Sequence, residues 1–269
     1  MDDNELRELA GSLVHTAQSA GELILRYREA NSEVSFKDDG SPVTDADRAA
    51  EELILNDLAR LAPGVLVVAE ESAAVIGDRL DPDKPFFLVD PLDGTRDFVR
   101  GGNDFTVNIA LIEDRQPVFG LIYVPASGRL YFTRAHGEAV AAHLPPSRGE
   151  SAKPLELTPL RTRQPNLAKL TVLASRSHMN EKTSQFIARH NVAEMLQFSS
   201  SSKFCVIAEG RADLYARLAP TCEWDTAAGH AILQAAGGVV LDLDGDPLAY
   251  GKVEKGLINS GFIAWGRQV

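Results

Sequence analysis

Two aspartates stand three positions apart in Asp90-Pro91-Leu92-Asp93-Gly94-Thr95, directly after the apolar run Phe86-Phe87-Leu88-Val89. Such a run is typical of a buried strand, and Asp-Pro-x-Asp-Gly is typical of a tight turn. Open α/β sheets bind ligands at the carboxyl ends of strands. Because carboxylates this close repel unless a cation or proton separates them, the segment indicates a divalent-cation site, with the Gly94 and Thr95 amides facing an anion. An ordinary turn explains the hexapeptide equally well.

Further carboxylates favour the cation site. Glu70 follows the apolar run 65–69, and neighbouring strands bring their ends together, so Glu70 is expected near Asp90. Asp225 precedes an Ala-rich helical stretch, where a carboxylate can be aimed at a cation while the helix start faces phosphate. The alternatives are a solvated strand end for Glu70 and a first-turn helix charge for Asp225.

Asp47 and Thr95 suggest a different role. A threonine hydroxyl beside a carboxylate can accept a proton from metal-bound water. The alternative is structural, since Asp45 and Asp47 also suit the first turn of a helix that Thr44 would cap.

The elements that would hold these residues follow from periodicity. Leucines and alanines at helical spacing predict a helix over 3–30, and a second helix runs from Thr44 to Leu61. A polar loop is expected over 36–42. The remaining expected elements are strands over 65–69, 105–112, 118–124, 130–133, 170–174 and 239–243, and helices over 180–190, 203–209 and 225–236. Prolines over 143–169 mark a soft boundary between an N-terminal half, 1–145, and a C-terminal half, 146–269, of one continuous catalytic unit.

Composition narrows the class of protein. The 269 residues carry a net charge of −11, which argues against nucleic-acid binding because that binding depends on phosphate neutralisation. Two cysteines, Cys205 and Cys222, are too few for a disulfide framework or a four-thiolate zinc site, so buried thiols in a reducing cytoplasm are expected. No apolar run approaches the about 18 residues of a membrane span, and the acidic start does not resemble a signal peptide.

These residues resemble the lithium-sensitive, magnesium-dependent phosphatases of the inositol monophosphatase superfamily, through 90–95, Trp224-Asp225 and the spacing of Glu70. Within it, the chain is most similar to CysQ-type 3'(2'),5'-bisphosphate nucleotidases. The stretches that carry this closer similarity are Ser41-Pro42-Val43-Thr44 with Asp47, 105–112, Ser175-Arg176-Ser177-His178, 200–205 and 224–230.

The resemblance implies an α/β (α+β) fold, a layered αβαβα sandwich, that hydrolyses 3'-phosphoadenosine 5'-phosphate to AMP and phosphate, and also 3'-phosphoadenylyl sulfate. It implies two to three Mg²⁺ ions: one on Glu70, Asp90 and the Leu92 carbonyl, one on Asp90, Asp93 and Asp225, and a weaker third near Glu70. The implied catalytic residues are Asp47, Thr95 and Glu70. The implied substrate-binding residues are Glu70, Leu92, Asp93, Gly94, Thr95, His178, Ser200, Lys203, Arg217 and Asp225.

One departure and several alternatives remain. Ser199 stands where CysQ-type chains usually have glycine, which removes the freedom to adopt positive φ and bears on the nucleotide pocket. Lys203 also suits a helix start, and Arg217 a pair with an acidic neighbour. Alternative functions are an inositol-1-monophosphatase or sugar phosphatase on the same fold, and a catalytically silent phosphonucleotide-binding protein. The expected partner is a small phosphorylated nucleotide, with no nucleic acid. The expected state is a monomer or homodimer, cytoplasmic, with the inner membrane's cytoplasmic face as an alternative location.

Overall fold

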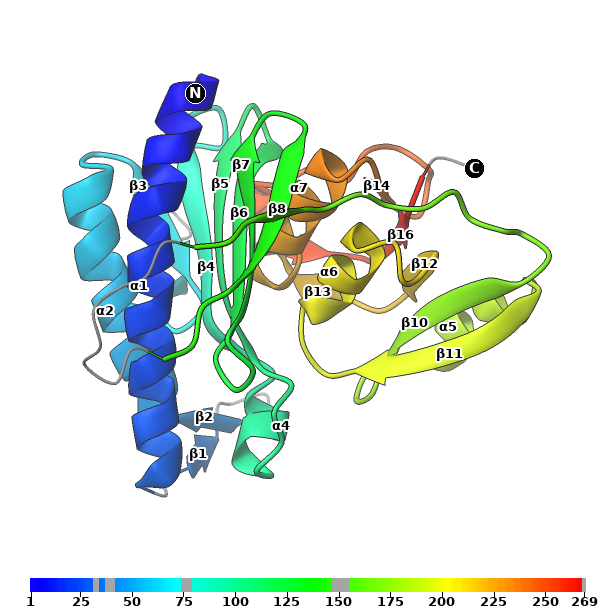
Figure 1. Cartoon of the computed structure of the whole chain (residues 1–269), viewed down its shortest axis with the longest axis horizontal. Helices are drawn as coiled ribbons and strands as arrows, with labels where there is room; N and C mark the ends of the chain where they lie inside the picture. The colour runs from blue at the N-terminus through cyan, green and yellow to red at the C-terminus, as the bar shows by residue number, and fades with distance from the viewer. Residues whose placement is uncertain (31–33, 37–41, 74–78, 147–154, 268–269) are drawn as a thin grey trace.

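The computed structural model describes residues 1–30, 34–36, 42–73, 79–146 and 155–267. Two long helices form the first layer (Figure 1). Helix α1, Asp3–Glu29, begins at a capping box in which the Asp2 side chain accepts from Asn4 N and Glu5 N. Helix α2, Asp45–Leu61, begins at a second capping box formed by Thr44 and Asp47. Both helices bury the apolar face that the sequence periodicity predicts.

A seven-stranded sheet forms the second layer, beneath these helices. Its strand order is β3-β4-β5-β6-β7-β8-β9, with β3 parallel to β4 and the other neighbours antiparallel. The bounds are Leu66–Ala69, Phe86–Asp93, Thr106–Glu113, Gln116–Val124, Arg129–Ala135, Glu138–His143 and Thr158–Pro159. A small hairpin of β1, Val34–Phe36, and β2, Pro42–Thr44, leads into α2.

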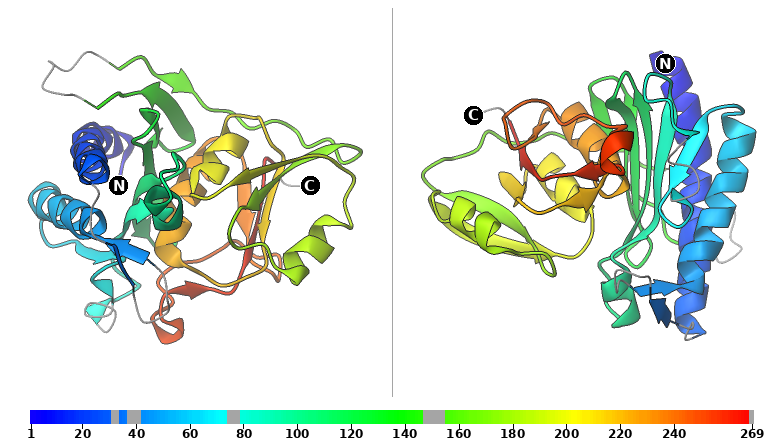
Figure 2. Two further views of the ribbon diagram at one scale, coloured as in Figure 1. Left: turned by 90° about the horizontal axis from the view of Figure 1, so that it is seen from below. Right: turned by 180° about the vertical axis from the view of Figure 1, so that it is seen from behind.

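Three further layers complete the fold, as the views in Figure 2 show. Helices α6, Ser202–Ala208, and α7, Ala227–Ala235, lie on the other face of the first sheet. A five-stranded sheet of order β11-β10-β12-β16-β14 follows, with α5, Glu181–Ile187, packed on it. Its strands are Val192–Phe198, Leu170–Ser175, Leu214–Arg217, Phe262–Trp265 and Val239–Leu241.

Short elements connect these layers. The short helix α4, Thr95–Val99, directly follows β4. Further short elements are β13, Thr221–Cys222, β15, Ile258–Asn259, and the 3-10 turns η2, Glu223–Asp225, and η3, Val253–Lys255. The order helix, sheet, helix, sheet, helix confirms the αβαβα expectation.

Strand β4 divides the core between two faces. Alternating side chains point to opposite faces of a strand. Phe87 and Val89 pack in the cluster shared with α1 and α2, whereas Phe86 and Leu88 pack in the cluster that also holds Phe204 of α6. The second cluster joins residues from both sides of the predicted boundary at 145/146, and the division into halves itself stays a prediction.

The structure confirms most predicted elements, corrects the settings of Asp90, Asp93 and Asp225, and adds strands that were not predicted. Asp90 and Asp93 do not lie on a tight turn, because β4 continues to Asp93 with a register shift against β5, and the chain turns at Gly94, whose φ is 97°. Asp225 does not begin a helix: it ends η2, and α7 starts at Ala227. Strands β8, β11, β12 and β16 were not predicted. Ser41 and most of the loop expected over 36–42 lie outside the described residues, but Phe36 and Pro42 are in strands.

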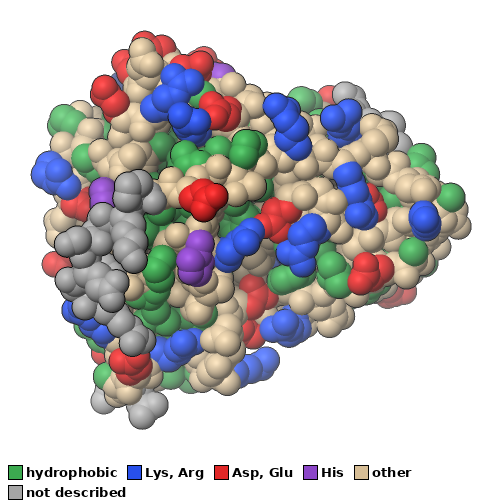
Figure 3. Space-filling model, in the orientation of Figure 1, with side chains coloured by type: hydrophobic (Ala, Val, Ile, Leu, Met, Phe, Trp, Pro, Cys, Tyr) green, Lys and Arg blue, Asp and Glu red, His purple; other side chains and the backbone are tan. Residues whose placement is uncertain are grey.

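Surface and thiol predictions have mixed outcomes. Acidic and basic side chains are interspersed on the face in Figure 3. Across the described part of the chain, no helix is both long and apolar enough to cross a membrane. Both cysteines are free thiols, and Cys205 is buried as expected, whereas Cys222 is only partly buried.

Candidate active site

Strands β3 and β4 bring Glu70 and Asp90 to the same edge of the first sheet. Their parallel register pairs Ala69 with Val89, and Glu70 N donates to Val89 O over 3.1 Å. Glu70 and Asp90, which follow this pair, therefore lie side by side, as the sequence predicts. Asp90 is buried, and its Oδ1 accepts from Leu92 N over 3.0 Å.

Asp93 and Asp225 join this edge from two directions. Asp93 lies at the end of β4, and the turn η2, which ends in Asp225, packs on β4 and β5. We call Glu70, Asp90, Asp93 and Asp225 the acid cluster. The structure thus brings together all four acidic residues that the sequence assigns to metal binding.

The electrostatics of the acid cluster are those of crowded like charges. Burial raises the pKa of Asp90 well above its usual range, and the charges of Glu70, Asp93 and Asp225 raise this pKa further. Burial, followed by the charge of Asp225, raises the pKa of Asp93 to about 7, against the opposing effect of Lys203. Burial likewise raises the pKa of Asp225. The cluster holds more negative charge than the protein around it neutralises.

The donor set suits magnesium. Carboxylate oxygens, with the Leu92 carbonyl beside them, are the hard ligands that Mg²⁺ selects. The carboxylates lie near one another, but their oxygens do not point to a common position. Among the described residues, no three acidic, imidazole or thiol side chains are placed to hold one ion together. Asp93 Oδ2 instead accepts from Ser201 N, and Asp225 Oδ2 accepts from the Thr221 hydroxyl. The residues present therefore fit the ion by the chemistry of their oxygens and by their charge.

Asp47 and Thr95 are in contact, and Asp47 also caps α2, so its position is compatible with both roles considered from the sequence. Its Oδ2 accepts from Thr44 N over 2.8 Å and from Thr44 Oγ1 over 2.6 Å, which caps α2. Its Oδ1 accepts from Thr95 Oγ1 over 3.2 Å. The same Thr95 hydroxyl lies 3.0 Å from Leu92 O. Burial raises the pKa of Asp47, so its carboxylate is a stronger base than an exposed one.

Glu223 fixes the turn that carries Asp225. Its side chain is fully buried and accepts from Gly251 N over 2.7 Å and from Lys252 N over 3.0 Å. Lys252 Nζ completes the set at 2.7 Å. Because a buried carboxylate with this many donors is held firmly, η2 has a defined position beside β4.

The residues assigned to the nucleotide lie on the C-terminal half and differ in accessibility. His178 is exposed and shares two hydrogen-bond contacts with Ser175 Oγ, and partial desolvation with the charges of Arg217, Arg96 and Lys203 lowers the pKa of His178 to about 4. Arg217 is partly buried at the end of β12. One guanidinium nitrogen donates to Pro220 O over 3.1 Å, and Nε is buried without a partner among the described residues.

Lys203 and Ser200 are buried, and their side chains are hydrogen-bonded within the protein. Lys203 Nζ donates to the carbonyls of Ser200 and Phe198 and lies 5.2 Å from the centre of the Tyr215 ring. Burial lowers the pKa of Lys203 to about 8, while Asp93 and Asp104 act in the opposite direction. Lys203 is the second residue of α6, so the helix-start reading of the sequence also describes its position.

Ser199 fits without a glycine's freedom. Among the described residues, the non-glycine positions with positive φ are Asp114, Arg115 and Leu257, so Ser199 is not one of them. Its hydroxyl lies 3.2 Å from Arg176 Nη1 and 3.4 Å from Asp97 Oδ1. The backbone strain that the substitution suggested is absent at this position.

Sequence reasoning missed several residues around the acid cluster. Asp104 of the N-terminal half accepts from Ser199 N, and Ser201 N of the C-terminal half donates to Asp93. Asn108 is the partner of Asp90 in the register of β4 and β5. Asn108 Nδ2 is buried without a partner among the described residues. Glu51, buried on α2, accepts from Glu71 N over 2.8 Å. Glu51 could have been found from the sequence, because it lies one helical turn after Asp47 and therefore on the same face of α2.

Comparisons with known proteins identify the family. Residues 5–266 match the inositol monophosphatase family. The 3'(2'),5'-bisphosphate nucleotidase CysQ of Shigella flexneri is 38% identical over 248 residues, covering 91% of this chain and 95% of that protein. The corresponding protein of Buchnera aphidicola is 35% identical and covers 97% and 95%.

Solved structures show the same fold. CysQ from Bacteroides thetaiotaomicron superposes with a TM-score of 0.80 at 37% identity, covering 97% of this chain and 98% of that one. The inositol monophosphatase of Thermotoga maritima superposes with a TM-score of 0.75 at 21% identity, covering 96% and 92%. The chain therefore belongs to the inositol monophosphatase family.

Proposed function

We propose that the protein is a Mg²⁺-dependent, Li⁺-sensitive phosphomonoesterase that hydrolyses 3'-phosphoadenosine 5'-phosphate to AMP and phosphate. The observation that carries this proposal is the acid cluster, in which burial and mutual repulsion raise the pKa values of Asp90 and Asp93. The proposal for the substrate is supported by the relatives named 3'(2'),5'-bisphosphate nucleotidase that match most of the chain. 3'-Phosphoadenylyl sulfate is the proposed second substrate.

The proposed metal ligands are Glu70, Asp90 and the Leu92 carbonyl for one ion, and Asp90, Asp93 and Asp225 for the second, with a weaker third near Glu70. Mg²⁺ bound there supplies Lewis acidity that activates water and neutralises the leaving oxygen. The donor chemistry and the raised pKa values of the carboxylates support this assignment. The number of ions is part of the proposal.

The chain's own residues would move the proton. Thr95 Oγ1 accepts a proton from the attacking water and passes its own proton to Asp47 Oδ1, which lies 3.2 Å away. Water oxygen bonds to phosphorus as the bond from phosphorus to the 3' oxygen breaks. Gly94 and Thr95 would present backbone N–H groups to the phosphate. Burial of Asp47 supports its role as the base, because burial raises the pKa of this carboxyl.

The substrate side is proposed to lie around His178, Lys203 and Arg217, with Ser200 as a further contact. The cations there support recognition of a second phosphate. His178 lies within the electrostatic influence of Arg217 and Lys203, which supports a common site for these side chains.

A substrate panel tests the proposal. Phosphate release would be measured with 3'-phosphoadenosine 5'-phosphate, inositol 1-phosphate and a sugar phosphate, with Mg²⁺ and then with Li⁺ added. The expected result is Mg²⁺-dependent release from the nucleotide that Li⁺ inhibits. Equal or faster release from inositol 1-phosphate would replace the proposal with the monophosphatase alternative. Nucleotide binding without release from any ester would favour the silent binding protein.

A further inference from the structure

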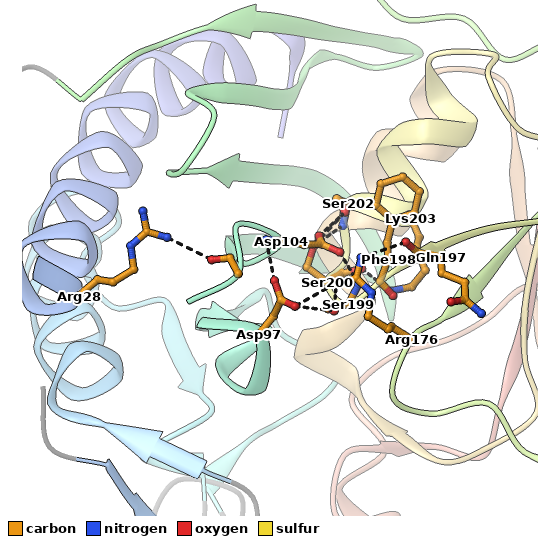
Figure 4. Close-up of polar contacts among 11 residues, drawn as sticks. Arg28, Asp97, Asp104, Arg176, Gln197, Phe198, Ser199, Ser200, Ser202 and Lys203 are labelled. Carbon is orange, nitrogen blue, oxygen red and sulfur yellow. Dashed lines mark hydrogen bonds and ion pairs between the residues drawn. The ribbon is translucent and has the colours of Figure 1, made fainter. Parts of the chain in front are cut away.

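Asp104 extends from the N-terminal half into a run of four serines, Ser199–Ser202, in the C-terminal half (Figure 4). Its Oδ2 accepts from Ser199 N. Its Oδ1 accepts from Ser200 Oγ over 2.6 Å and from Ser202 Oγ over 3.1 Å. One carboxylate therefore holds three of the four serines just before and at the start of α6.

These contacts leave Ser200 without a free hydroxyl hydrogen. A serine hydroxyl has one hydrogen to donate, and Ser200 donates it to Asp104. Its oxygen also accepts from Ser202 N over 3.3 Å, and only 1% of the residue is exposed. In this arrangement Ser200 holds the serine run together through Asp104 and Ser202.

Ser201, the one serine of the run that does not bond to Asp104, instead contacts the acid cluster. Ser201 N donates to Asp93 Oδ2, and Ser201 Oγ donates to Asn108 Oδ1 over 2.8 Å. Asp104 and Asp93 therefore hold neighbouring residues of the same run. A shift of the run caused by loss of Asp104 would move the amide that orients Asp93.

The backbone of Asp104 is itself fixed beside the end of β4. Gly94 approaches it so closely that a Cβ there would lie 2.7 Å from Asp104 O. Asp97 Oδ2 accepts from Asp104 N over 2.9 Å, and Gly102 leaves room for this carboxylate, since a Cβ at Gly102 would lie 2.1 Å from it. Arg28 of α1 donates to Gly102 O over 3.1 Å. The anchor of the serine run is thus rigid.

We propose that Asp104 is a positioning residue of the acid cluster. By fixing the serine run across the two halves, it aims Ser201 N at Asp93 and so sets the orientation of a proposed Mg²⁺ ligand. This inference rests on the proposed function. Residues that orient a metal ligand typically affect metal affinity or activity by about 10–100-fold.

The test is Asp104→Asn in the full chain. Asparagine keeps the shape but replaces one acceptor oxygen with an NH₂ group that faces a donor. The expected result is a Mg²⁺ concentration for half-maximal phosphate release about 10-fold higher than in the wild type. The Mg²⁺ concentration that gives half of the metal-induced rise in melting temperature, measured without substrate, rises in parallel.

Arg176→Gln is the matched control. Arg176 also joins the two halves, through Asp97 Oδ1 at 2.9 Å, but its other hydrogen bonds are to Ser199 Oγ and Gln197 O and not to Asp104 or Ser200–Ser202. Its half-maximal Mg²⁺ concentration is expected within about twofold of the wild type. If Asp104→Asn does not fold, the double variant Ser200→Ala and Ser202→Ala removes two of the three bonds and is expected to shift the Mg²⁺ dependence in the same direction.

The outcomes separate the inference from the proposed function. An increased KM for 3'-phosphoadenosine 5'-phosphate with unchanged Mg²⁺ dependence would place Asp104 on the substrate side and overturn its positioning role. Equal shifts in Asp104→Asn and Arg176→Gln would also overturn it, because a general effect on the interface would then explain both. A wild type without any Mg²⁺ response would overturn the proposed function itself, and the positioning role with it.

Discussion

Asp90 of the acid cluster and Asp213 are both buried carboxylates, but their charges are compensated differently. Asp213 accepts from Arg163 Nε over 2.7 Å, from Arg163 Nη2 over 2.8 Å and from Thr171 N over 2.8 Å. These hydrogen bonds outweigh burial and lower the pKa of Asp213. In the acid cluster, burial and mutual repulsion raise the pKa values of Asp90 and Asp93.

This difference separates a structural carboxylate from a functional one. Asp213 finds a cation and a backbone donor within the protein and ties β12 to β10. The raised pKa values of the acid cluster support the proposal that cations from solution bind there. Burial alone does not distinguish the two sites, whereas charge compensation does.

Removal of one acid from the cluster should lower the catalytic rate but raise the thermal stability of the metal-free protein. Asp93→Asn is expected to lower kcat for 3'-phosphoadenosine 5'-phosphate by about 10²–10³-fold, because a proposed ligand of the Mg²⁺ that would stabilise the transition state is lost. In Mg²⁺-free solution the variant is expected to melt at a higher temperature than the wild type, because repulsion with Asp90 and Asp225 is relieved. Phosphate release and thermal unfolding measure the two effects. Normal turnover would show that the metal assignment is wrong.

The opposite pattern is expected for Asp213→Asn. Its loss of charge weakens the bonds to Arg163, whose side chain is 42% exposed, so solvent screening limits the cost. Unfolding free energy is expected to fall by about 2 kcal/mol, measured by urea denaturation, with kcat within about twofold of the wild type. A large loss of kcat without loss of stability would remove the distinction between the sites.

A buried base provides a third test of charge compensation. Burial lowers the pKa of His230 to about 3, and its Nδ1 lies 3.1 Å from Tyr250 OH. The unfolded chain binds a proton at this residue below about pH 6.5, whereas the folded chain does not. Stability from this residue is therefore present at pH 7 and lost as pH falls towards 3, by about 2 kcal/mol at pH 5.

His230→Gln should reduce that pH dependence. The difference in unfolding free energy between pH 7 and pH 5 is expected to be smaller in the variant by the same amount. An unchanged difference would show that His230 is protonated in the folded protein.

The smallest effect is expected at Ser199. Ser199→Gly restores the residue usual in CysQ-type chains, but the backbone here does not require positive φ. Loss of the hydroxyl near Arg176 and Asp97 and the added chain entropy should cost less than about 1 kcal/mol. KM and Mg²⁺ dependence are expected within about twofold of the wild type. A tenfold fall in KM would show that Ser199 distorts the nucleotide pocket.

The sequence predicted the positions of the acidic residues better than the turn and loops around them, because paired strand ends are neighbours whereas the turn depends on distant contacts. Glu70 and Asp90 each follow an apolar run, and strand ends that pair are neighbours by necessity. Asp225 was found by motif, but its 3-10 turn was not predicted, because η2 is held by Glu223 and Lys252, which bind across more than twenty residues. Local pattern does not contain such contacts.

Asp104 illustrates the same limit. It lies in a loop that reads as polar and solvated, and its partners begin 95 positions later. Strands β11 and β12 escaped prediction similarly, since β11 is mostly exposed at a sheet edge and β12 is only four residues long. Periodicity identifies long amphipathic elements such as α1, whereas short strands are defined by the sheet they join.

The most direct test of the acid cluster as the catalytic magnesium site is phosphate release from 3'-phosphoadenosine 5'-phosphate as a function of Mg²⁺ concentration. Wild type and Asp93→Asn would be compared after removal of bound metal. The expected result is no release without Mg²⁺, saturable activation of the wild type, and a loss in the variant that added Mg²⁺ does not restore. Release that persists in the presence of a chelator, or a variant as active as the wild type, would contradict the assignment.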